Sequence, residues 1–337
     1  MGIIIENPGL LTTVQDKGRF GYAQFGVTPS GPMDVESFQI ANLLVGNSPG
    51  ERALEATVLG PTFRVTEDTV IAIAGADMSP TLNGVSISMH RAISVPAGSE
   101  VKLQAAKDGS RAYIAFRGGL DVPLVMGSRA TNLQNHIGGV DGRKLIKGDN
   151  IPLRPVSGVL PNLAHRSVAH HIRRKRENTI RVLLGPQDDC FTGEGLTTFL
   201  ETPYTVSREF DRMGCRLKGQ AITHKTDGNI ISDGIVNGAI QVPTTGQPII
   251  MLAERQATGG YTKIATVISV DLPVIGQCCP GDILRFQAVS VEEAHRLLKQ
   301  EQSRMQDLER YLNEPPGIHT YRVTIDGRTY EVVAEIV

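Results

Sequence analysis

The sequence predicts a mainly β protein with a few helices, an α+β fold built from two β-rich halves. Glycine (36) and proline (19) are plentiful while aromatic residues make up 5% and tryptophan is absent, a mix that favours short strands and turns over long helices. Short apolar runs alternate with turn residues about every ten positions, which is typical of a β-barrel or sandwich. A chain of 337 residues exceeds one ordinary core, so two domains are expected.

The composition also excludes several classes of protein. A net charge of −1 argues against a nucleic-acid partner, which needs a clearly basic surface. No apolar run approaches the roughly 18 to 20 residues of a membrane span, and no secretory signal is evident, so a cytoplasmic protein is expected. The four cysteines show neither a CxxC motif nor metal-ligand spacing, which predicts reduced thiols and no metal site.

Residues 1–155 are expected to form the first β domain, with one helix near 35–46. Asp34 is a good N-cap, apolar residues then recur on one helical face, and Gly46 ends the pattern. From 53 to 152 short apolar runs separated by Gly, Pro, Asn and Asp indicate strands throughout.

Residues 156–178 are expected to be a linker, whose basic run is interpreted as a solvated boundary and not as a nucleic-acid patch. A second β domain over 179–288 should follow, with a short helix near 190–200. In the last segment, 289–337, Ser290 and Glu293 form a capping box that starts a helix. The tail should be a hairpin turning at Asp326-Gly327.

The stretch 240–264 is the first candidate for the chemistry. We expect two strands, 248–253 and 263–270, flanking a loop that contains Thr258, Gly259, Gly260 and Tyr261. Two adjacent glycines let the backbone approach a ligand closely, and Arg255, Tyr261 and Lys263 would be at hand to contact it. The alternative is that the glycines only turn the chain and the cations are solvated, since short glycine motifs have a high false-positive rate.

Two further segments combine carboxylates with arginines. Gln15, Asp16 and Arg19 lie in a glycine-punctuated stretch, where Arg19 either recognises an anion or simply pairs with Asp16. Asp211 and Arg212 repeat the theme in the second half. The sequence contains no P-loop, GxSxG or HExxH motif, which argues against a self-contained nucleotide site, a serine hydrolase or a zinc protease.

Taken in order from about residue 7 to 286, these segments resemble the carboxyltransferase-like family, also called the allophanate hydrolase subunit 2 family. That family includes the C subunit of bacterial 5-oxoprolinase, the Kip-type antagonist of a sporulation-kinase inhibitor, and the carboxyltransferase part of urea carboxylase. The motifs that carry the resemblance are Pro8–Arg19, Ser30–Asp34, Ala41–Asn47, Asp211–Gly214, Gly238–Pro243, Thr258–Tyr261 and Pro280–Asp282.

The resemblance implies two cyclophilin-like β-barrel domains and work in a heteromeric complex. Together with the 5-oxoprolinase B subunit (Kip-inhibitor-like) and A subunit (LamB/YcsF-like), such a protein opens 5-oxo-L-proline to L-glutamate while hydrolysing ATP. ATP, with Mg²⁺, is the implied cofactor, and no covalent biotin is expected on this chain. Activating a cyclic amide by phosphorylation requires cations and donors around the phosphoryl group, so we expect polar side chains of both halves to face a shared cleft.

The candidate residues divide into two groups. The expected catalytic residues are Arg19, Asp211, Arg212 and Lys263. The expected substrate- or nucleotide-binding residues are Gln15, Asp16, Asp34, Gln241, Gln247, Thr258, Gly259, Gly260 and Tyr261.

Two other functions stay open. A biotin-dependent carboxyltransferase is one, because the tail 321–333 looks like the opening strands of a biotin-carrier domain, although the Met-Lys-Met lysine that carries biotin is missing from the sequence. The other is a non-catalytic antagonist that binds an inhibitor of a sporulation kinase.

Overall fold

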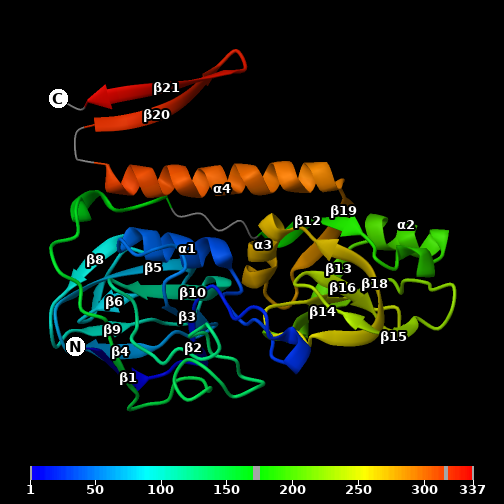
Figure 1. The fold of residues 1–337 in the computed structure, drawn as a ribbon, viewed down its shortest axis with the longest axis horizontal. Coiled ribbons are helices and arrows are strands. Elements are labelled where there is room, and N and C mark those ends of the chain that lie inside the picture. The colour runs from blue at the N-terminus through cyan, green and yellow to red at the C-terminus, as the bar shows by residue number, and fades with distance from the viewer. Residues whose placement is uncertain (1, 170–174, 315–317, 336–337) are drawn as a thin grey trace.

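The computed structural model describes residues 2–169, 175–314 and 318–335 and shows a mainly β, α+β protein, as predicted (Figure 1). The first half contains a six-stranded sheet in the order β11-β1-β4-β9-β6-β7 and a five-stranded sheet in the order β2-β3-β10-β5-β8. The strands are β1 (Gly2–Asn7), β2 (Leu11–Gln15), β3 (Ala53–Thr57), β4 (Thr62–Val65), β5 (Thr69–Asp77), β6 (Thr81–Leu82), β7 (Val85–Ser86), β8 (Ala92–Val95), β9 (Glu100–Lys102), β10 (Asp108–Phe116) and β11 (Asn150–Pro152).

The core of this half lies between its two sheets. Ile3 and Phe63 from the first sheet and Ile71 and Ile114 from the second belong to one fully buried cluster. The outer face of β5 and β10 is buried as well, because helix α1 (Val35–Leu44) covers it. This double burial explains why β5 and β10 read as continuous apolar runs without alternation.

The second half is one eight-stranded sheet in the order β12-β19-β13-β14-β17-β16-β18-β15. Its strands are β12 (Glu177–Leu184), β13 (Tyr204–Phe210), β14 (Gly214–Lys218), β15 (Asn229–Gly234), β16 (Ala239–Val242), β17 (Ile249–Met251), β18 (Thr258–Val267) and β19 (Ile283–Ala288). A further pairing of β12 with β18 closes the seven strands from β12 to β18 in this order into a barrel, and β15 is paired with β18 outside that ring. The finer domain boundaries and the cyclophilin-like class stay predictions.

Helices α1 and α4 (Val291–Asn313) begin where the sequence predicts, whereas the sequence does not predict α3 (Leu272–Gln277). The Asp34 side chain caps α1 by accepting hydrogen bonds from the Ser37 amide (3.0 Å) and hydroxyl (2.6 Å). Ser290 caps α4 through the Glu293 amide (3.2 Å). The remaining helices are α2 (Gly193–Glu201), α3 (Leu272–Gln277), α4 (Val291–Asn313), and the short 3₁₀ helices η1 (Ala23–Phe25), η2 (Leu163–His165), η3 (Asp188–Cys190) and η4 (Ser269–Asp271).

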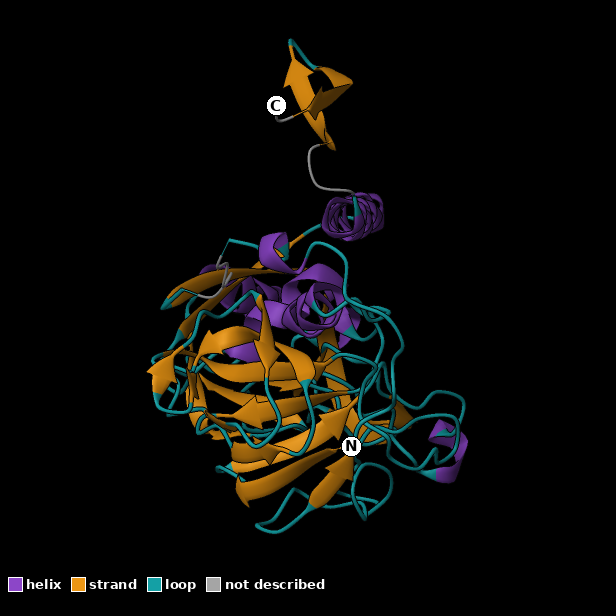
Figure 2. Ribbon diagram, turned by 90° about the vertical axis from the view of Figure 1, so that its left-hand side faces the viewer, coloured by secondary structure: helices purple, strands orange, loops and turns teal. Residues whose placement is uncertain are grey.

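The long helix α4 runs across the molecule above α1 and α3, and the predicted terminal hairpin, β20 (Ile318–Ile325) and β21 (Arg328–Glu335), lies beyond it (Figures 1 and 2). Leu312 near the end of α4 is buried against the α1 cluster. Among the described residues, no helix is both long and apolar enough to cross a membrane.

Helix α3 joins the two halves. The Gln277 side chain donates to Asp34 Oδ2 (2.7 Å) and to the carbonyl of Arg111 (2.8 Å), both in the first half. Gly276 is required here because a Cβ on it would lie 2.4 Å from the Met33 carbonyl oxygen. The halves are therefore in direct backbone contact.

Candidate functional site

The predicted loop at 258–261 is wrong, because Thr258, Gly259, Gly260 and Tyr261 belong to strand β18. Tyr261 pairs opposite Asn229 of β15, and the next residues of β18 pair opposite β16. Pairing with β15 engages the backbone of this segment along one edge, which outweighs the turn tendency of two glycines.

Within this strand, Gly259 makes room for the side chain of Gln241 from β16. A Cβ on Gly259 would lie 2.7 Å from Gln241 Nε2, whereas a Cβ on Gly260 would meet nothing closer than 3.5 Å. Gln241 is 1% exposed, and its Nε2 has no hydrogen-bond partner among the described residues. A buried amide left unpaired costs about 1–3 kcal/mol, so this donor is the kind of group that a ligand completes.

Gln241 lines a cavity of about 480 Å³ on the barrel. The rest of the lining comes from β13, β14, β17, β18 and the intervening turns: Arg208, Glu209, Phe210, Asp211, Met213, Gly214, Arg216, Ile249, Met251, Gln256 and Tyr261. The strand register explains the convergence, because Arg216 pairs opposite Ile249 and Ile249 pairs opposite Gln241. Directly opposite residues share one face of a sheet. We call this cavity the barrel cleft.

The lining of the barrel cleft combines two arginines with two carboxylates, Glu209 and Asp211, and its cations and donors suit a small anion that also has a hydrogen-bond acceptor. Arg208 and Arg216 supply exposed guanidinium groups, and Arg216 Nε lies 3.2 Å from a Glu209 oxygen in an exposed ion pair worth little by itself. Tyr261, 40% exposed, contributes a hydroxyl. Arginines suit carboxylates and phosphates, and the Gln241 amide suits a carbonyl oxygen.

Three of the predicted site residues line the barrel cleft: Asp211, Gln241 and Tyr261. Asp211 also builds the turn between β13 and β14, because its Oδ1 accepts hydrogen bonds from the Met213 amide (2.7 Å) and the Gly214 amide (3.1 Å). Gln247 does not line the cleft. Its side chain accepts a hydrogen bond from the Gly219 amide (2.9 Å) and donates one to the Gly219 carbonyl (3.1 Å).

The predicted anion site around Arg19 is instead a tie between two loops of the first half. Arg19 is buried and donates to the carbonyls of Val125 (2.9 Å) and Ala130 (3.1 Å). Asp16 accepts from the Ser128 hydroxyl and the Arg129 amide, each at 2.6 Å. These side chains hold the loop at 125–130 in place, and burial lowers the pKa of Arg19.

Gln15 has a similar local role. Its side chain donates to Thr131 O (3.3 Å) and accepts from the Gly31 amide (3.0 Å). Asp34 is occupied by the cap of α1 and by Gln277, and burial raises its pKa. Both residues therefore join segments of the protein to one another.

Arg212 lies at the junction of the two halves. Its guanidinium forms ion pairs with Glu55 of β3 and with Glu254 (2.7 Å), and it donates to the Gly31 carbonyl (2.7 Å). Burial alone would lower the pKa of Arg212, but the two carboxylates outweigh it and raise that pKa. For Glu55, burial would raise the pKa, but Arg212 and then Arg111 outweigh it and lower the pKa. We call Glu55, Arg212 and Glu254 the interface ion cluster.

Lys263 and Arg19 do not face a common cleft. Lys263 is 2% exposed and its Nζ pairs with Asp233 Oδ2 at 2.8 Å, which lowers the pKa of Asp233. Neither Lys263 nor Arg19 lines the barrel cleft, whose lining comes entirely from the second half. The barrel cleft therefore does not provide the expected cations from both halves, because Arg19 donates to carbonyls of the first half and Lys263 pairs with Asp233.

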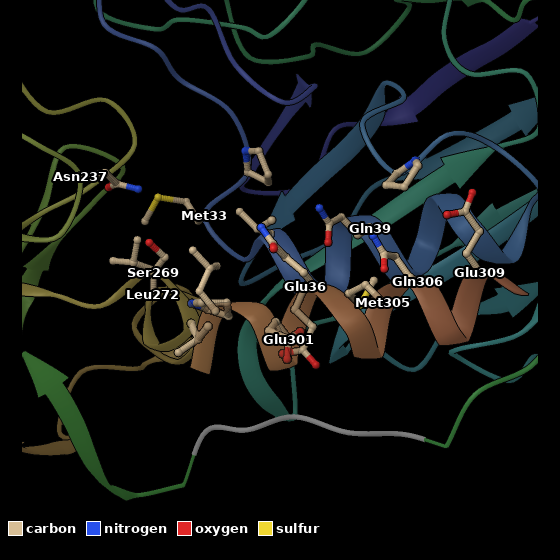
Figure 3. A pocket seen from close by; sticks show the side chains of 17 residues that line it. Met33, Glu36, Gln39, Asn237, Ser269, Leu272, Glu301, Met305, Gln306 and Glu309 are labelled. Carbon is tan, nitrogen blue, oxygen red and sulfur yellow. The ribbon is translucent and has the colours of Figure 1, made fainter. Parts of the chain in front are cut away.

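A larger cavity of about 660 Å³ does lie between the halves, under α4 (Figure 3). Glu36, Glu301 and Glu309 point toward it, together with Met33 and the apolar residues of α3. None of the described residues that line it is a lysine or arginine. The neighbouring cation Arg304 is already paired with Glu36 and Glu301, whereas the barrel cleft is lined by Arg208 and Arg216, so the barrel cleft is the better site for an anion.

Sequence reasoning assigned neither Arg208 nor Arg216 to the site. Both are exposed cations on adjacent antiparallel strands, β13 and β14. Their signal is the alternation of buried and exposed positions along those strands, most clearly in Cys215, Arg216 and Leu217. Which cations meet a glutamine on β16 depends on strand order, and that is set by tertiary structure.

Comparison with known proteins shows which proteins this chain is similar to. The chain matches the family "carboxyltransferase domain, subdomain A and B" over residues 25–288. It is 35% identical to the C subunit of Escherichia coli 5-oxoprolinase over 304 residues, covering 90% of this chain and 96% of that protein. It is also 35% identical to urea amidolyase of Saccharomyces cerevisiae, but there it covers only 17% of the relative.

A solved structure agrees. The chain superposes on urea carboxylase of Kluyveromyces lactis with a TM-score of 0.84 and 29% identity, covering 99% of this chain and 32% of the larger one. The sequence match and the shared fold lead to one assignment: the chain belongs to the carboxyltransferase-domain family, subdomains A and B.

Proposed function

We propose that this chain is the C subunit of an ATP-dependent 5-oxoprolinase and that the barrel cleft binds 5-oxo-L-proline. The observation that carries the proposal is the match to a 5-oxoprolinase C subunit, which covers 96% of that protein and 90% of this chain. A match of this kind relates two whole proteins, whereas the urea amidolyase match relates this chain to a small part of a much larger one.

The chemistry of the barrel cleft supports this ligand. 5-Oxoproline carries one carboxylate and one lactam carbonyl. Arg208 and Arg216 suit the carboxylate, and the unpaired Gln241 amide suits the lactam oxygen. The volume of about 480 Å³ lies within the usual range for small-molecule sites, about 300–1,000 Å³.

ATP fits this cleft poorly. Phosphate groups are usually held by a glycine-rich loop or by the backbone amides of a helix N-terminus. The described lining is built from strands and turns, with Gly214 as its one glycine and no helix N-terminus. We therefore assign ATP and Mg²⁺ to a site formed with the partner proteins, and the work of this chain to binding and orienting the lactam.

The net reaction breaks the lactam C–N bond. One water supplies a hydroxyl to the carbonyl carbon and a proton to the nitrogen, and a second water is consumed as ATP becomes ADP and phosphate. The ring carbonyl must be held while negative charge develops on its oxygen, a task for fixed N–H donors such as the Gln241 amide.

Reconstitution tests the proposal. The purified chain is mixed with the A and B subunits of the same organism, and glutamate release from 5-oxoproline is followed with and without ATP. We expect release only when all three proteins and ATP are present. ATP-independent release, or no release from the complete mixture, would contradict the proposal.

A carboxyltransferase of the urea carboxylase type is the second candidate. It is favoured by the superposition on urea carboxylase over 99% of this chain. The same cleft would then accept urea and a carboxyl group delivered by a separate biotin carrier. Urea-dependent consumption of ATP and bicarbonate with a biotin carboxylase and its carrier, without glutamate release, would favour this function over the first.

A further inference from the structure

One loop of the first half reaches the rim of the barrel cleft. The Gln134 side chain donates to the sulfur of Met213, a residue that lines the cleft. Beside it, the Leu133 amide donates to Glu254 Oε2 (3.3 Å), a carboxylate of the interface ion cluster. Gln134 therefore belongs to the first half and lies at the edge of a cleft that is lined by the second half.

The loop holds Gln134 in a defined place. Asn132, which is buried, and Ile137 exchange backbone hydrogen bonds (2.8 and 3.3 Å), which closes a loop over 133–136. The Asn132 side chain donates to Thr28 Oγ1 (2.8 Å) and accepts from the Asn135 amide (2.8 Å). The Gln134 side chain itself is exposed, so the loop presents it to solvent.

The wall that Gln134 touches is also fixed from the first half. Phe210 and Met213 both line the cleft, and Arg212 between them points instead into the junction of the halves. Arg111 of β10 stacks on Phe210, with its guanidinium carbon 4.9 Å from the ring centroid, within the range of a cation–π contact. The position of Gln134 relative to the cleft is therefore set by contacts on both sides.

The hydrogen bond from Gln134 to Met213 is weak. A thioether sulfur is a poor acceptor, so little hydrogen bonding is lost when the amide leaves it. The carbonyl oxygen of the side chain, Oε1, accepts no hydrogen bond from the described residues. An exposed amide with a weakly held donor and an open acceptor can turn to a ligand in the cleft.

The ligand of the proposed function needs one more partner. Arg208 and Arg216 suit the carboxylate of 5-oxoproline, and the Gln241 amide suits its lactam oxygen. The ring N–H is a hydrogen-bond donor, and a donor that is taken out of water without an acceptor lowers affinity. A neutral acceptor at the cleft would complete the binding of the lactam.

Gln134 suits this role better than the acceptors of the lining do. Glu209 is paired with Arg216, and Asp211 Oδ1 accepts two backbone amides of its turn. Both carboxylates also carry negative charge, which opposes the carboxylate of the ligand. Tyr261 offers a neutral hydroxyl and is the alternative that the experiment distinguishes.

We propose that Gln134 is a substrate-binding residue of the barrel cleft, whose Oε1 accepts the ring N–H of a cyclic amide and so makes the cleft selective for a lactam. The inference rests on the proposed function, since 5-oxoproline is the ligand of that function. A site that bonds a substrate N–H discriminates against an analogue that lacks it, because the acceptor is then left unpaired.

The test measures the affinity of the reconstituted complex for two ligands. One is 5-oxo-L-proline, and the other is 3-oxocyclopentanecarboxylate, in which a CH2 group replaces the ring N–H. Calorimetry with a non-hydrolysable ATP analogue gives both Kd values without turnover. We expect wild type to bind the lactam at least about tenfold more tightly than the ketone, the worth of one hydrogen bond.

Three variants assign that preference. Gln134→Leu should bind the lactam about tenfold more weakly and the ketone as wild type does, so that the preference is lost. Gln134→Glu keeps an acceptor oxygen but adds a negative charge, so both ligands should bind more weakly while the preference remains. Asn135→Ala is the matched control and should behave as wild type, because Asn135 is exposed on the same loop and bonds Asn132 through its backbone amide.

A Gln134→Leu complex that keeps the wild-type preference would overturn the proposal, and loss of the preference in Tyr261→Phe instead would assign the ring N–H to Tyr261. Equal affinity of wild type for the two ligands would overturn it as well. Either result leaves the proposed function intact when the same complex releases glutamate from 5-oxoproline. A wild-type complex that neither binds the lactam nor releases glutamate contradicts the proposed function itself, and the role of Gln134 with it.

Discussion

Gly259 and Gln241 form the contact on which the candidate site depends. We expect Gly259→Ala to push the Gln241 amide and the Ile235 side chain aside, since a Cβ would come within 2.7 Å of both. Both are flexible side-chain ends, so the free energy of unfolding should fall by no more than about 1–2 kcal/mol. In the reconstituted complex, KM for 5-oxoproline should rise at least about tenfold, measured by initial rates.

Gly260→Ala is the matched control, because its nearest neighbour would be 3.5 Å away. It should keep the KM of wild type. If both variants behave alike, Gln241 does not contact the substrate.

Residue types in the sequence predict part of the candidate site. Asp211, Gln241 and Tyr261 are polar residues within motifs, and all three line the barrel cleft. Arg19 and Lys263 were predicted as cations beside glycine-containing segments, but their charges are used inside the fold, by loop carbonyls and by Asp233. A sequence shows that a cation is present but not whether a carbonyl or carboxylate distant in sequence already accepts its hydrogen bonds.

At the scale of elements, Arg166 joins the C-terminal ends of two helices. It is buried and donates to the carbonyls of Leu43 (2.6 Å) and Leu44 (2.7 Å) at the end of α1 and of Leu312 (2.6 Å) in α4. Cations are favoured at helix C-termini, where carbonyls have no partner within the helix.

Arg166→Leu should lower the free energy of unfolding by about 3–5 kcal/mol, because several buried carbonyls lose a charged donor at once. Arg91→Ala removes a single exposed bond to Ala164 O and should cost less than about 1 kcal/mol. Urea unfolding at neutral pH measures both. Equal losses would show that α4 is held by other contacts.

The helix starts at Asp34 and Ser290 and the terminal hairpin were all predicted correctly, because each depends on a few neighbouring residues. The 258–261 segment was not, because its strand state depends on partners some 20 to 30 residues away. Local chemistry therefore predicts the ends of elements, and tertiary pairing decides whether a glycine pair turns or extends.

At the scale of the whole molecule, the interface ion cluster links the two halves. Glu55→Gln should lower the free energy of unfolding by about 3–5 kcal/mol at pH 7, because it leaves Arg212 partly unpaired in a buried site. Glu177→Gln, which breaks the exposed pair with Arg285, is the control and should cost less than about 1 kcal/mol.

The pH dependence gives a second readout of the cluster. Because the pKa of Glu55 is lowered in the folded protein, its stabilisation is present above the ordinary value of 4.5 and is lost as the pH falls through the folded pKa. The pKa of Asp34 is raised, so its effect on stability changes with pH in the opposite direction. The quantity to follow is therefore the difference in the free energy of unfolding between wild type and Glu55→Gln. That difference should shrink between about pH 5 and pH 3; a constant difference would contradict the account.

Composition and turn spacing predict the two-part β architecture, but they do not predict which half contributes the lining of the cleft. The first half uses buried Arg19 to hold a loop, and the lining of the barrel cleft comes from the second half alone. A family motif indicates that a residue matters, either to the fold or to the site. The contacts of that residue in the structure show which of these two roles it has.

The central claim is that the barrel cleft binds the substrate through its arginines. The direct measurement is kcat/KM for 5-oxoproline in the reconstituted complex, for wild type, Arg216→Ala and the control Arg285→Ala. Both arginines are exposed on strands of the same sheet and form exposed ion pairs, with Glu209 and Glu177 respectively. We predict that Arg216→Ala loses about 10- to 100-fold, the worth of a charge-assisted hydrogen bond, and that Arg285→Ala keeps the wild-type value. An Arg216→Ala complex as active as wild type would contradict the account.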